Sequence, residues 1–113
     1  MVELNQNYLD IEEALFHIKD GVLLIYQKGS GSFLMLNNLL SSFHNDIYGS
    51  FVDLFNVFSI NEFHPLFDDF NKTYGIPNNS AVLIIVDCKI VEIFHSPISK
   101  NRLLNSLQTI AKT

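Results

Sequence analysis

The residues that could carry chemistry are few and lie far apart in the chain. There is one cysteine, Cys88, so no disulfide can form within the chain. Reactive thiolates are stabilised by positive charges nearby, and the only basic residue next to Cys88 in the sequence is Lys89. The histidines stand singly, none at metal-ligand spacing from another histidine, a cysteine or a carboxylate; they are His17, His44, His64 and His95. We expect no metal and no cofactor, and we interpret Cys88 as an incidental surface cysteine, with a monothiol role as the alternative.

A glycine–serine loop, Lys28-Gly29-Ser30-Gly31-Ser32, has the composition of a ligand site. It precedes a predicted helix, and the first backbone N–H groups of a helix can hold an anion. The loop does not match the P-loop pattern, and its serines lack the G-x-S-x-G motif of a nucleophile. Because glycine and serine are also common turn residues, we interpret the loop as a turn and keep an anionic ligand as the alternative.

The charged side chains are distributed as on a solvated surface. Two adjacent acidic pairs, Glu12-Glu13 and Asp68-Asp69, fall in predicted helices, where neighbouring residues point in different directions. The chain has 12 acidic and 7 basic residues, and the basic ones are scattered, whereas a nucleic-acid binder presents a basic patch. We therefore expect no catalytic carboxylate pair, no nucleic-acid partner and no docking on a membrane.

The length and composition predict one folded domain. The chain has 113 residues, which predicts a single domain spanning residues 1–113. With 48% of residues hydrophobic, it can build a core without disulfides or metals. The first seven residues lack the basic region and apolar run of a signal peptide, and no apolar stretch is long enough to cross a bilayer. We therefore expect a cytoplasmic protein.

The elements that must position any site can be read from the apolar pattern. Two continuous apolar runs, Val22–Tyr26 and Ala81–Val86, are typical of central strands covered on both faces. Further strands are predicted at Phe51–Phe58 and at Ile90–His95, with room for a short one at Val2–Leu4; Asp87–Lys89 is predicted to be the turn of a hairpin.

Helical spacing of apolar residues predicts the remaining elements. Helices are expected over Leu9–Lys19, Phe33–Tyr48, Asn61–Tyr74 and from Ser99 onward. Leu9, Phe16 and Phe63 are counted among the apolar residues of these patterns. The resulting order predicts an α/β fold with a central mixed sheet of four to five strands, flanked by helices on both faces.

Several segments, in this order, resemble the thioredoxin family. Gly21–Tyr26 resembles the first central strand of that family, and Ala81–Lys89 resembles a later strand with its turn. Lys72–Ile76 resembles the K-Y-G-I stretch that ends the family's third helix, and Ile98–Leu103 resembles the L-S-K-x-x-L opening of its last helix. The resemblance covers nearly the whole chain and implies a thioredoxin-like fold.

The departures from the family bear on function. Active members carry a C-x-x-C motif after the first central strand, where a thiolate attacks a disulfide and a second thiol resolves the product; here the segment is Ser30-Gly31-Ser32-Phe33. Ile25 stands where the family has a buried aspartate, and Ser80 stands where it has a cis-proline. Since a cis bond before a residue other than proline costs about 3 kcal/mol, we expect a trans bond at Ser80. The resemblance, with these losses, implies a divergent member without dithiol activity.

The function that we predict is a non-catalytic protein-binding, accessory or chaperone-like module whose partner is another protein or a peptide. In thioredoxins the edge around the active loop binds extended polypeptides, so the resemblance places the site on the residues Lys28, Gly29, Ser30, Gly31, Ser32, Phe33, Ile76, Pro77, Asn78, Asn79 and Ser80. One alternative is an enzyme of another class that uses the glycine–serine loop for an anionic or glutathione-type ligand. Another is a structural homodimer, suggested by the 10 phenylalanines.

Overall fold

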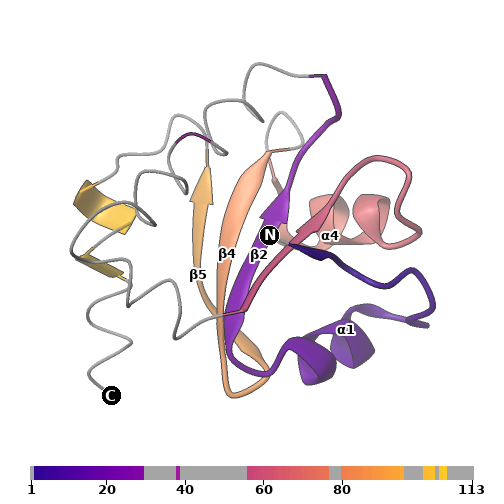
Figure 1. The fold of residues 1–113 in the computed structure, drawn as a ribbon, viewed down its shortest axis with the longest axis horizontal. Helices are drawn as coiled ribbons and strands as arrows, with labels where there is room; N and C mark the ends of the chain where they lie inside the picture. The colour runs from indigo at the N-terminus through magenta and orange to yellow at the C-terminus, as the bar shows by residue number, and fades with distance from the viewer. Residues whose placement is uncertain are drawn as a thin grey trace.

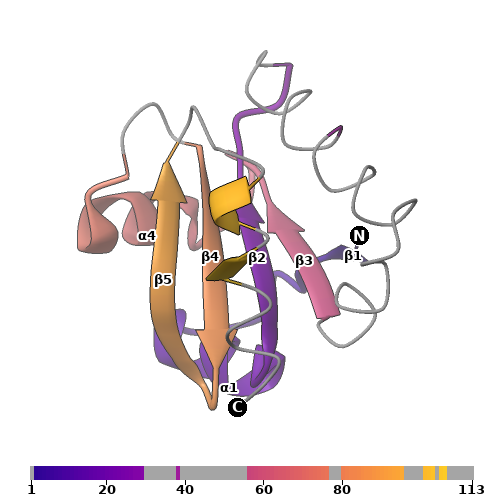
Figure 2. The same ribbon diagram turned by 90° about the vertical axis from the view of Figure 1, so that its left-hand side faces the viewer.

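The computed structural model describes residues 2–29, 38, 56–76, 80–95, 101–103 and 105–106. The strands within them form one sheet in the order β1-β3-β2-β4-β5 (Figures 1 and 2). They are β1 (Val2–Glu3), β2 (Gly21–Ile25), β3 (Asn56–Ile60), β4 (Ala81–Val86) and β5 (Lys89–His95). β3 runs parallel to β1 and β2, whereas β4 runs antiparallel to β2 and β5. This confirms the predicted mixed sheet.

The two apolar runs form the central strands, as predicted. Every residue of β2 is buried, and so is every residue of β4 except the half-buried Val86. Successive side chains of a strand point to opposite faces. Leu23 and Leu83 pack into the core beneath the helices, and Leu24 and Ile84, which are also fully buried, belong to the other face. The sheet is therefore covered on both faces, which is why these strands show no polar alternation.

Helices lie on both faces of this sheet. α1 (Ile11–Ile18) and α4 (Phe67–Tyr74) pack on one face through a shared core, and the helical residues 101–103 and 105–106 lie on the opposite side (Figures 1 and 2). The predicted helix Phe33–Tyr48 lies outside the described residues except for Asn38, which is helical, and residues 51–55 of the predicted third strand also lie outside them. None of the described helices is long and apolar enough to span a lipid bilayer.

Helix α1 begins at a reciprocal side-chain cap. The carboxylate of Asp10 accepts a hydrogen bond from the backbone N–H of Glu13 at 2.9 Å, and the Glu13 carboxylate accepts one from the N–H of Leu9 at 3.4 Å. The arrangement resembles a capping box and satisfies donors that have no partner inside the helix. The helix ends where Lys19 adopts a positive φ of 60°, within one residue of its predicted end.

Helix α4 starts later than its apolar pattern predicted. Residues 61–66 form turns instead of helix. The side chain of Asn61 accepts a hydrogen bond from the N–H of Phe63 at 2.9 Å, and the ring of His64 accepts one from the N–H of Leu66 at 3.1 Å. Such local bonds compete with the helix for its first donors, and Pro65 disfavours a helical conformation at the residue before it. The helix therefore begins only at Phe67.

Three apolar residues that we assigned to helical patterns are exposed. The exposed fractions are 87% for Leu9, 76% for Phe16 and 71% for Phe63. Leu9 precedes the cap of α1, and Phe63 lies in the turn before α4, so neither belongs to a helix. Phe16 is one position beyond the buried Leu15 and therefore points about 100° away from it around the helix.

The hairpin at the end of the sheet has the geometry of a two-residue loop. Asp87 and Cys88 have positive φ values of 53° and 65°, as in the type I′ turn that suits the twist of a hairpin. The predicted turn is confirmed, with β5 beginning one residue earlier than expected. The register shifts between Ile84 and Ile85, which leaves Val91 of β5 in a bulge. A bulge on an edge strand discourages pairing with another chain.

Candidate functional site

Of the predicted partner-binding residues, the structure describes Lys28, Gly29, Ile76 and Ser80. We call the end of the sheet where Lys28, Gly29 and Ser80 lie the loop edge, and we include in it the neighbouring residues Tyr26, Gln27, Glu62 and Phe63. Ile25 pairs with Ala81 across the antiparallel strands, so the segment that leaves β2 and the residue that enters β4 lie at the same end. Lys28 and Gly29 are exposed there, and Gly29 has a φ of 82° with open space around it. The other predicted residues of this site lie outside the described residues; they are Ser30, Gly31, Ser32, Phe33, Pro77, Asn78 and Asn79.

Ile76 and Ser80 offer little side-chain surface at this edge. Ile76 is 7% exposed and belongs to the core beneath the helices. Ser80 is 1% exposed, and its hydroxyl has no hydrogen-bond partner among the described residues. A partner that reaches this part of the edge would therefore meet backbone rather than these two side chains.

The sequence pattern missed the turn that completes the loop edge. The backbone N–H of Lys28 donates a hydrogen bond to the carboxylate of Glu62 at 2.6 Å, which ties the loop after β2 to the turn after β3. Phe63 follows with its ring in solvent. The sequence feature that could have indicated this turn is Asn61 directly after a strand pattern, since asparagine often begins a turn.

Two buried polar residues fix this turn. Asn61 is 7% exposed, and its amide donates a hydrogen bond to the carboxylate of Glu3 at 3.2 Å. His64 is 4% exposed; because its Nδ1 accepts from Leu66, its Nε2 carries the proton and donates to the carbonyl of Asn5 at 2.9 Å. His64 is thus a structural residue of the turn that precedes α4.

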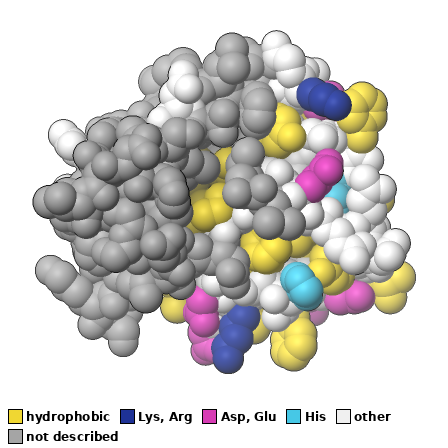
Figure 3. All heavy atoms as spheres, in the orientation of Figure 1, with side chains coloured by type: hydrophobic (Ala, Val, Ile, Leu, Met, Phe, Trp, Pro, Cys, Tyr) yellow, Lys and Arg dark blue, Asp and Glu magenta, His cyan; other side chains and the backbone are white. Residues whose placement is uncertain are grey.

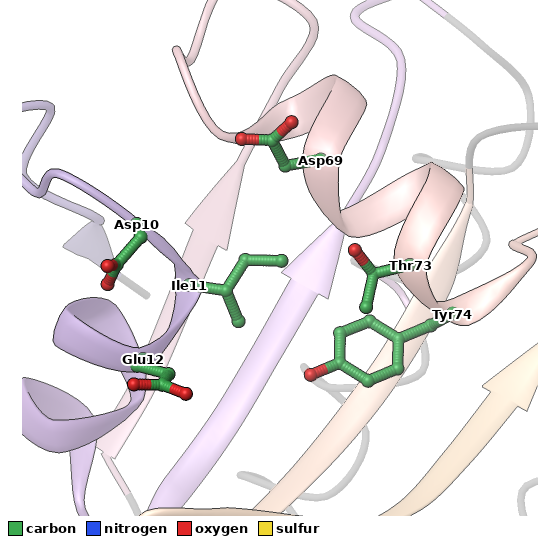
Figure 4. A pocket seen from close by; sticks show the side chains of 6 residues that line it. All are labelled: Asp10, Ile11, Glu12, Asp69, Thr73 and Tyr74. Atoms are coloured by element: carbon green, nitrogen blue, oxygen red, sulfur yellow. The ribbon is translucent and has the colours of Figure 1, made fainter.

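A hollow lies between α1 and α4, with a volume of about 390 Å³ (Figure 4). Its lining is three carboxylates, a hydroxyl, a phenol and one aliphatic side chain, contributed by Asp10, Ile11, Glu12, Asp69, Thr73 and Tyr74. The sequence interpretation treated the two acidic pairs as separate solvated faces, whereas one member of each pair, Glu12 and Asp69, lines this common hollow. No pattern along the chain could have shown this, because it depends on how α1 packs beside α4.

Comparison with known proteins bears on the fold. No protein family and no curated protein matches the sequence. Among solved structures, the chain is similar to the solution structure of reduced desulfothioredoxin from Desulfovibrio vulgaris Hildenborough, with a TM-score of 0.68 and 12% identity over 96% of each chain. The chain has a thioredoxin-like fold. At this identity the similarity establishes the fold and leaves the chemistry to this chain's own residues.

Two of the positions that the resemblance associates with redox chemistry are described in this thioredoxin-like fold, Ile25 and Ser80. Ile25, in place of the family's aspartate, is 0% exposed and packs in the core. Ser80 stands in place of the cis-proline. The hydrocarbon side chain of Ile25 cannot carry a proton, so it cannot take the role that the resemblance gives to the aspartate.

Cys88 lies at the opposite end of the thioredoxin-like sheet. β4 separates it from Ser80 by roughly 20 Å, at a rise of about 3.3 Å per residue. The backbone N–H of Cys88 donates to the carbonyl of Lys19 at 2.9 Å, and its Sγ lies 4.0 Å from the carbonyl oxygen of Phe16. The thiol therefore faces the C-terminal end of α1.

Proposed function

We propose that this chain is a non-catalytic thioredoxin-like domain of the cytoplasm that binds another protein or a peptide through the loop edge. The observation that carries the proposal is the replacement of redox groups while the sheet is retained. Ile25 is packed in the core, and the single cysteine of the chain lies at the far end of β4. A thioredoxin-like fold without the redox thiols can still act by binding another molecule through its surface.

The surface at the loop edge supports a polypeptide partner. Phe63 is 71% exposed, and the turn that carries it is fixed by the hydrogen bonds of Asn61 and His64. An aromatic side chain on a fixed turn gives a large contact area with little loss of conformational freedom, as interface anchors do. Beside it, the exposed backbone of Gly29 can pair with an extended chain.

The chemistry of the loop edge argues against the anionic or glutathione-type alternative. An anion at the glycine–serine loop needs free backbone N–H groups, but the N–H of Lys28 is already bonded to the Glu62 carboxylate. A second negative charge would be repelled there. Titration with reduced glutathione is therefore expected to leave the amide resonances of Lys28 and Gly29 unchanged.

Within the part of the chain that the structure describes, the exposed apolar side chains that could support the homodimer alternative are scattered. The large apolar residues that are exposed in the described part are Leu9, Phe16, Phe63 and Val91, and they lie near α1, on the turn before α4 and on β5. On the face seen in Figure 3, hydrophobic side chains likewise reach the surface at separate points among charged ones. A symmetric homodimer uses one self-complementary patch on each subunit, so we favour a different protein as the partner.

The test compares two exposed phenylalanines. Proteins captured by the wild-type chain are compared with those captured by Phe63→Ala and by Phe16→Ala, and each candidate partner is then purified and titrated. Phe63→Ala should weaken binding about tenfold or more, since truncating an interface anchor costs roughly 1–2 kcal/mol or more. Phe16→Ala, which removes an equally exposed ring elsewhere, should leave the affinity unchanged. Equal losses for both variants, or none for Phe63→Ala, would exclude the loop edge as the binding surface.

A further inference from the structure

His64 is a buried titratable side chain whose two ring nitrogens are both engaged. The ring is 4% exposed. Its Nε2 donates a hydrogen bond to the carbonyl of Asn5 at 2.9 Å, and its Nδ1 accepts one from the backbone N–H of Leu66 at 3.1 Å. A neutral imidazole can form both bonds, because it carries one donor and one acceptor. The observed arrangement therefore requires the neutral ring.

A second proton on the ring would remove the acceptor. Both nitrogens of an imidazolium are donors, so the N–H of Leu66 would face another N–H and lose its partner. This hydrogen bond is buried, and a buried donor without a partner is costly. The charged ring would also lie three residues before Phe67, where α4 begins, and a cation is unfavourable at the N-terminus of a helix. Protonation therefore opposes the closed turn for two separate reasons.

The turn that His64 closes carries the exposed Phe63. The backbone N–H of His64 donates to the carbonyl of Asn61 at 3.0 Å, which encloses Glu62 and Phe63 between them. The Glu62 carboxylate accepts from the N–H of Lys28. A change at His64 therefore reaches Phe63 within the turn and reaches the loop after β2 through Glu62.

The carboxylates on the segments that adjoin the turn favour a charged ring, since opposite charges attract. They belong to Glu3 on β1, Glu62 in the turn itself, and Asp68 and Asp69 in the first turn of α4, and the basic group on these segments is Lys28. Among the described residues none of these carboxylates bonds to the ring, whose nitrogens are taken by backbone atoms. They promote uptake of a proton without providing a partner that would keep the charged ring in place.

We propose that His64 is an acid-sensitive lock on the loop edge. Histidine is the side chain that ordinarily titrates between about pH 5 and 8. Here the ring takes up a second proton only when its bond to Leu66 is broken. The open turn therefore holds one proton more than the closed turn, and a falling pH favours opening. The role of this lock in regulating partner binding rests on the proposed function, with binding at neutral pH and release on acidification.

Nuclear magnetic resonance of the ¹⁵N-labelled full chain tests the lock without any partner. Amide shifts and the ring shifts of the histidines are recorded from about pH 7.5 to about pH 5. The amide of Leu66 and the ring of His64 should titrate with the same midpoint. Protection of the Leu66 and Phe63 amides against hydrogen exchange should fall at least about fivefold over this range, whereas the amides of β2 and β4 should keep their protection.

Matched variants assign the effect to His64. His64→Asn keeps a side-chain acceptor for the N–H of Leu66 but cannot take up a proton in this range, so the inflection at Leu66 should disappear. His95→Asn, at an exposed position of β5, should leave the inflection unchanged, and so should Glu62→Gln, which removes the other titratable group of the turn. If His64→Asn does not fold, the shared midpoint of ring and amide in the wild-type chain still identifies the titrating group.

Four results would overturn the inference. They are a Leu66 amide that does not titrate in this range, an inflection that persists in His64→Asn, an inflection that vanishes in Glu62→Gln, and a simultaneous loss of protection throughout β2 and β4, which would be general acid unfolding. None of them bears on binding at neutral pH, which the comparison of Phe63→Ala with Phe16→Ala measures. Failure of the lock is therefore distinguishable from failure of the proposed function.

Discussion

Replacement of His64 by alanine should destabilise the chain strongly, although the residue takes no part in chemistry. The ring is 4% exposed and satisfies two backbone groups, the N–H of Leu66 and the carbonyl of Asn5. Leu66 is buried, so its N–H would lose its partner at a cost of about 1–3 kcal/mol. The carbonyl of Asn5 lies on an exposed residue, where water can replace the ring. With the lost packing of the imidazole, the free energy of unfolding should fall by about 2–4 kcal/mol.

Two further variants separate the contributions of the ring nitrogens. In His64→Asn the side-chain oxygen can take the place of Nδ1 and keep the bond to Leu66, so the loss should be about 1 kcal/mol. In His64→Gln the longer amide can reach Asn5 but leaves the buried N–H unpaired, so the loss should approach that of His64→Ala. His95→Ala, at an exposed position of β5, should change stability by less than about 0.5 kcal/mol.

The assay is urea denaturation followed by far-ultraviolet circular dichroism, since the chain has no tryptophan. An unchanged slope with a lowered midpoint would report a loss of stability rather than a change in the unfolded state. The reasoning fails if His64→Ala lies within about 0.5 kcal/mol of wild type. It also fails if His64→Asn is no more stable than His64→Ala, because the buried N–H would then not be the dominant contribution.

The remaining predictions concern the core, alkaline pH and redox activity. Leu24→Ala should lower the free energy of unfolding by about 2–5 kcal/mol, because the side chain is fully buried in the central strand; a loss no larger than that of the exposed control Val91→Ala would show that the core is misplaced. Burial raises the pKa of Tyr74 above its ordinary value of about 10. Above that pH the unfolded chain therefore holds fewer protons than the folded one, and the free energy of unfolding should fall as the pH rises. Tyr74→Phe should reduce this fall in urea titrations, and a pH profile identical to that of the wild type would refute the prediction. The chain should not reduce insulin disulfides faster than its Cys88→Ser variant, and clear turnover above that control would contradict the non-redox proposal.

The two central strands could be predicted because their continuous apolar runs are compatible with few other secondary structures. The runs that became β2 and β4 are continuous, short and rich in β-branched residues, and such runs favour strands covered on both faces. The turn at Asp87 and Cys88 followed from its place between two strand patterns. Periodicity alone predicted helix from Asn61 onward, because it cannot show that side chains will capture the backbone donors needed to start one.

The candidate sites could be predicted only in part, since each depends on contacts between distant segments. The family resemblance placed the loop edge at Lys28 and Gly29, but the hydrogen bond to Glu62 joins residues 34 positions apart. Phe63 was assigned to a helical pattern, so its exposure could not be anticipated. Glu12 and Asp69 line one hollow between α1 and α4, and adjacent acids in a sequence give no sign that two pairs so far apart will share a surface.

The packing around Ile25 explains how this fold can persist without its redox groups. The side chain is 0% exposed and lies in the core, between the neighbours Ile60 and Ala81 in the sheet. A carboxylate at this position would be costly to bury without a hydrogen-bonding partner, whereas full burial of an isoleucine contributes roughly 1.5–3 kcal/mol. Isoleucine therefore stabilises the end of the central strand β2, at the position where the resemblance places the acid that serves thiol exchange. Cysteines introduced at Ser30 and Phe33 would accordingly lack the buried acid that the family uses.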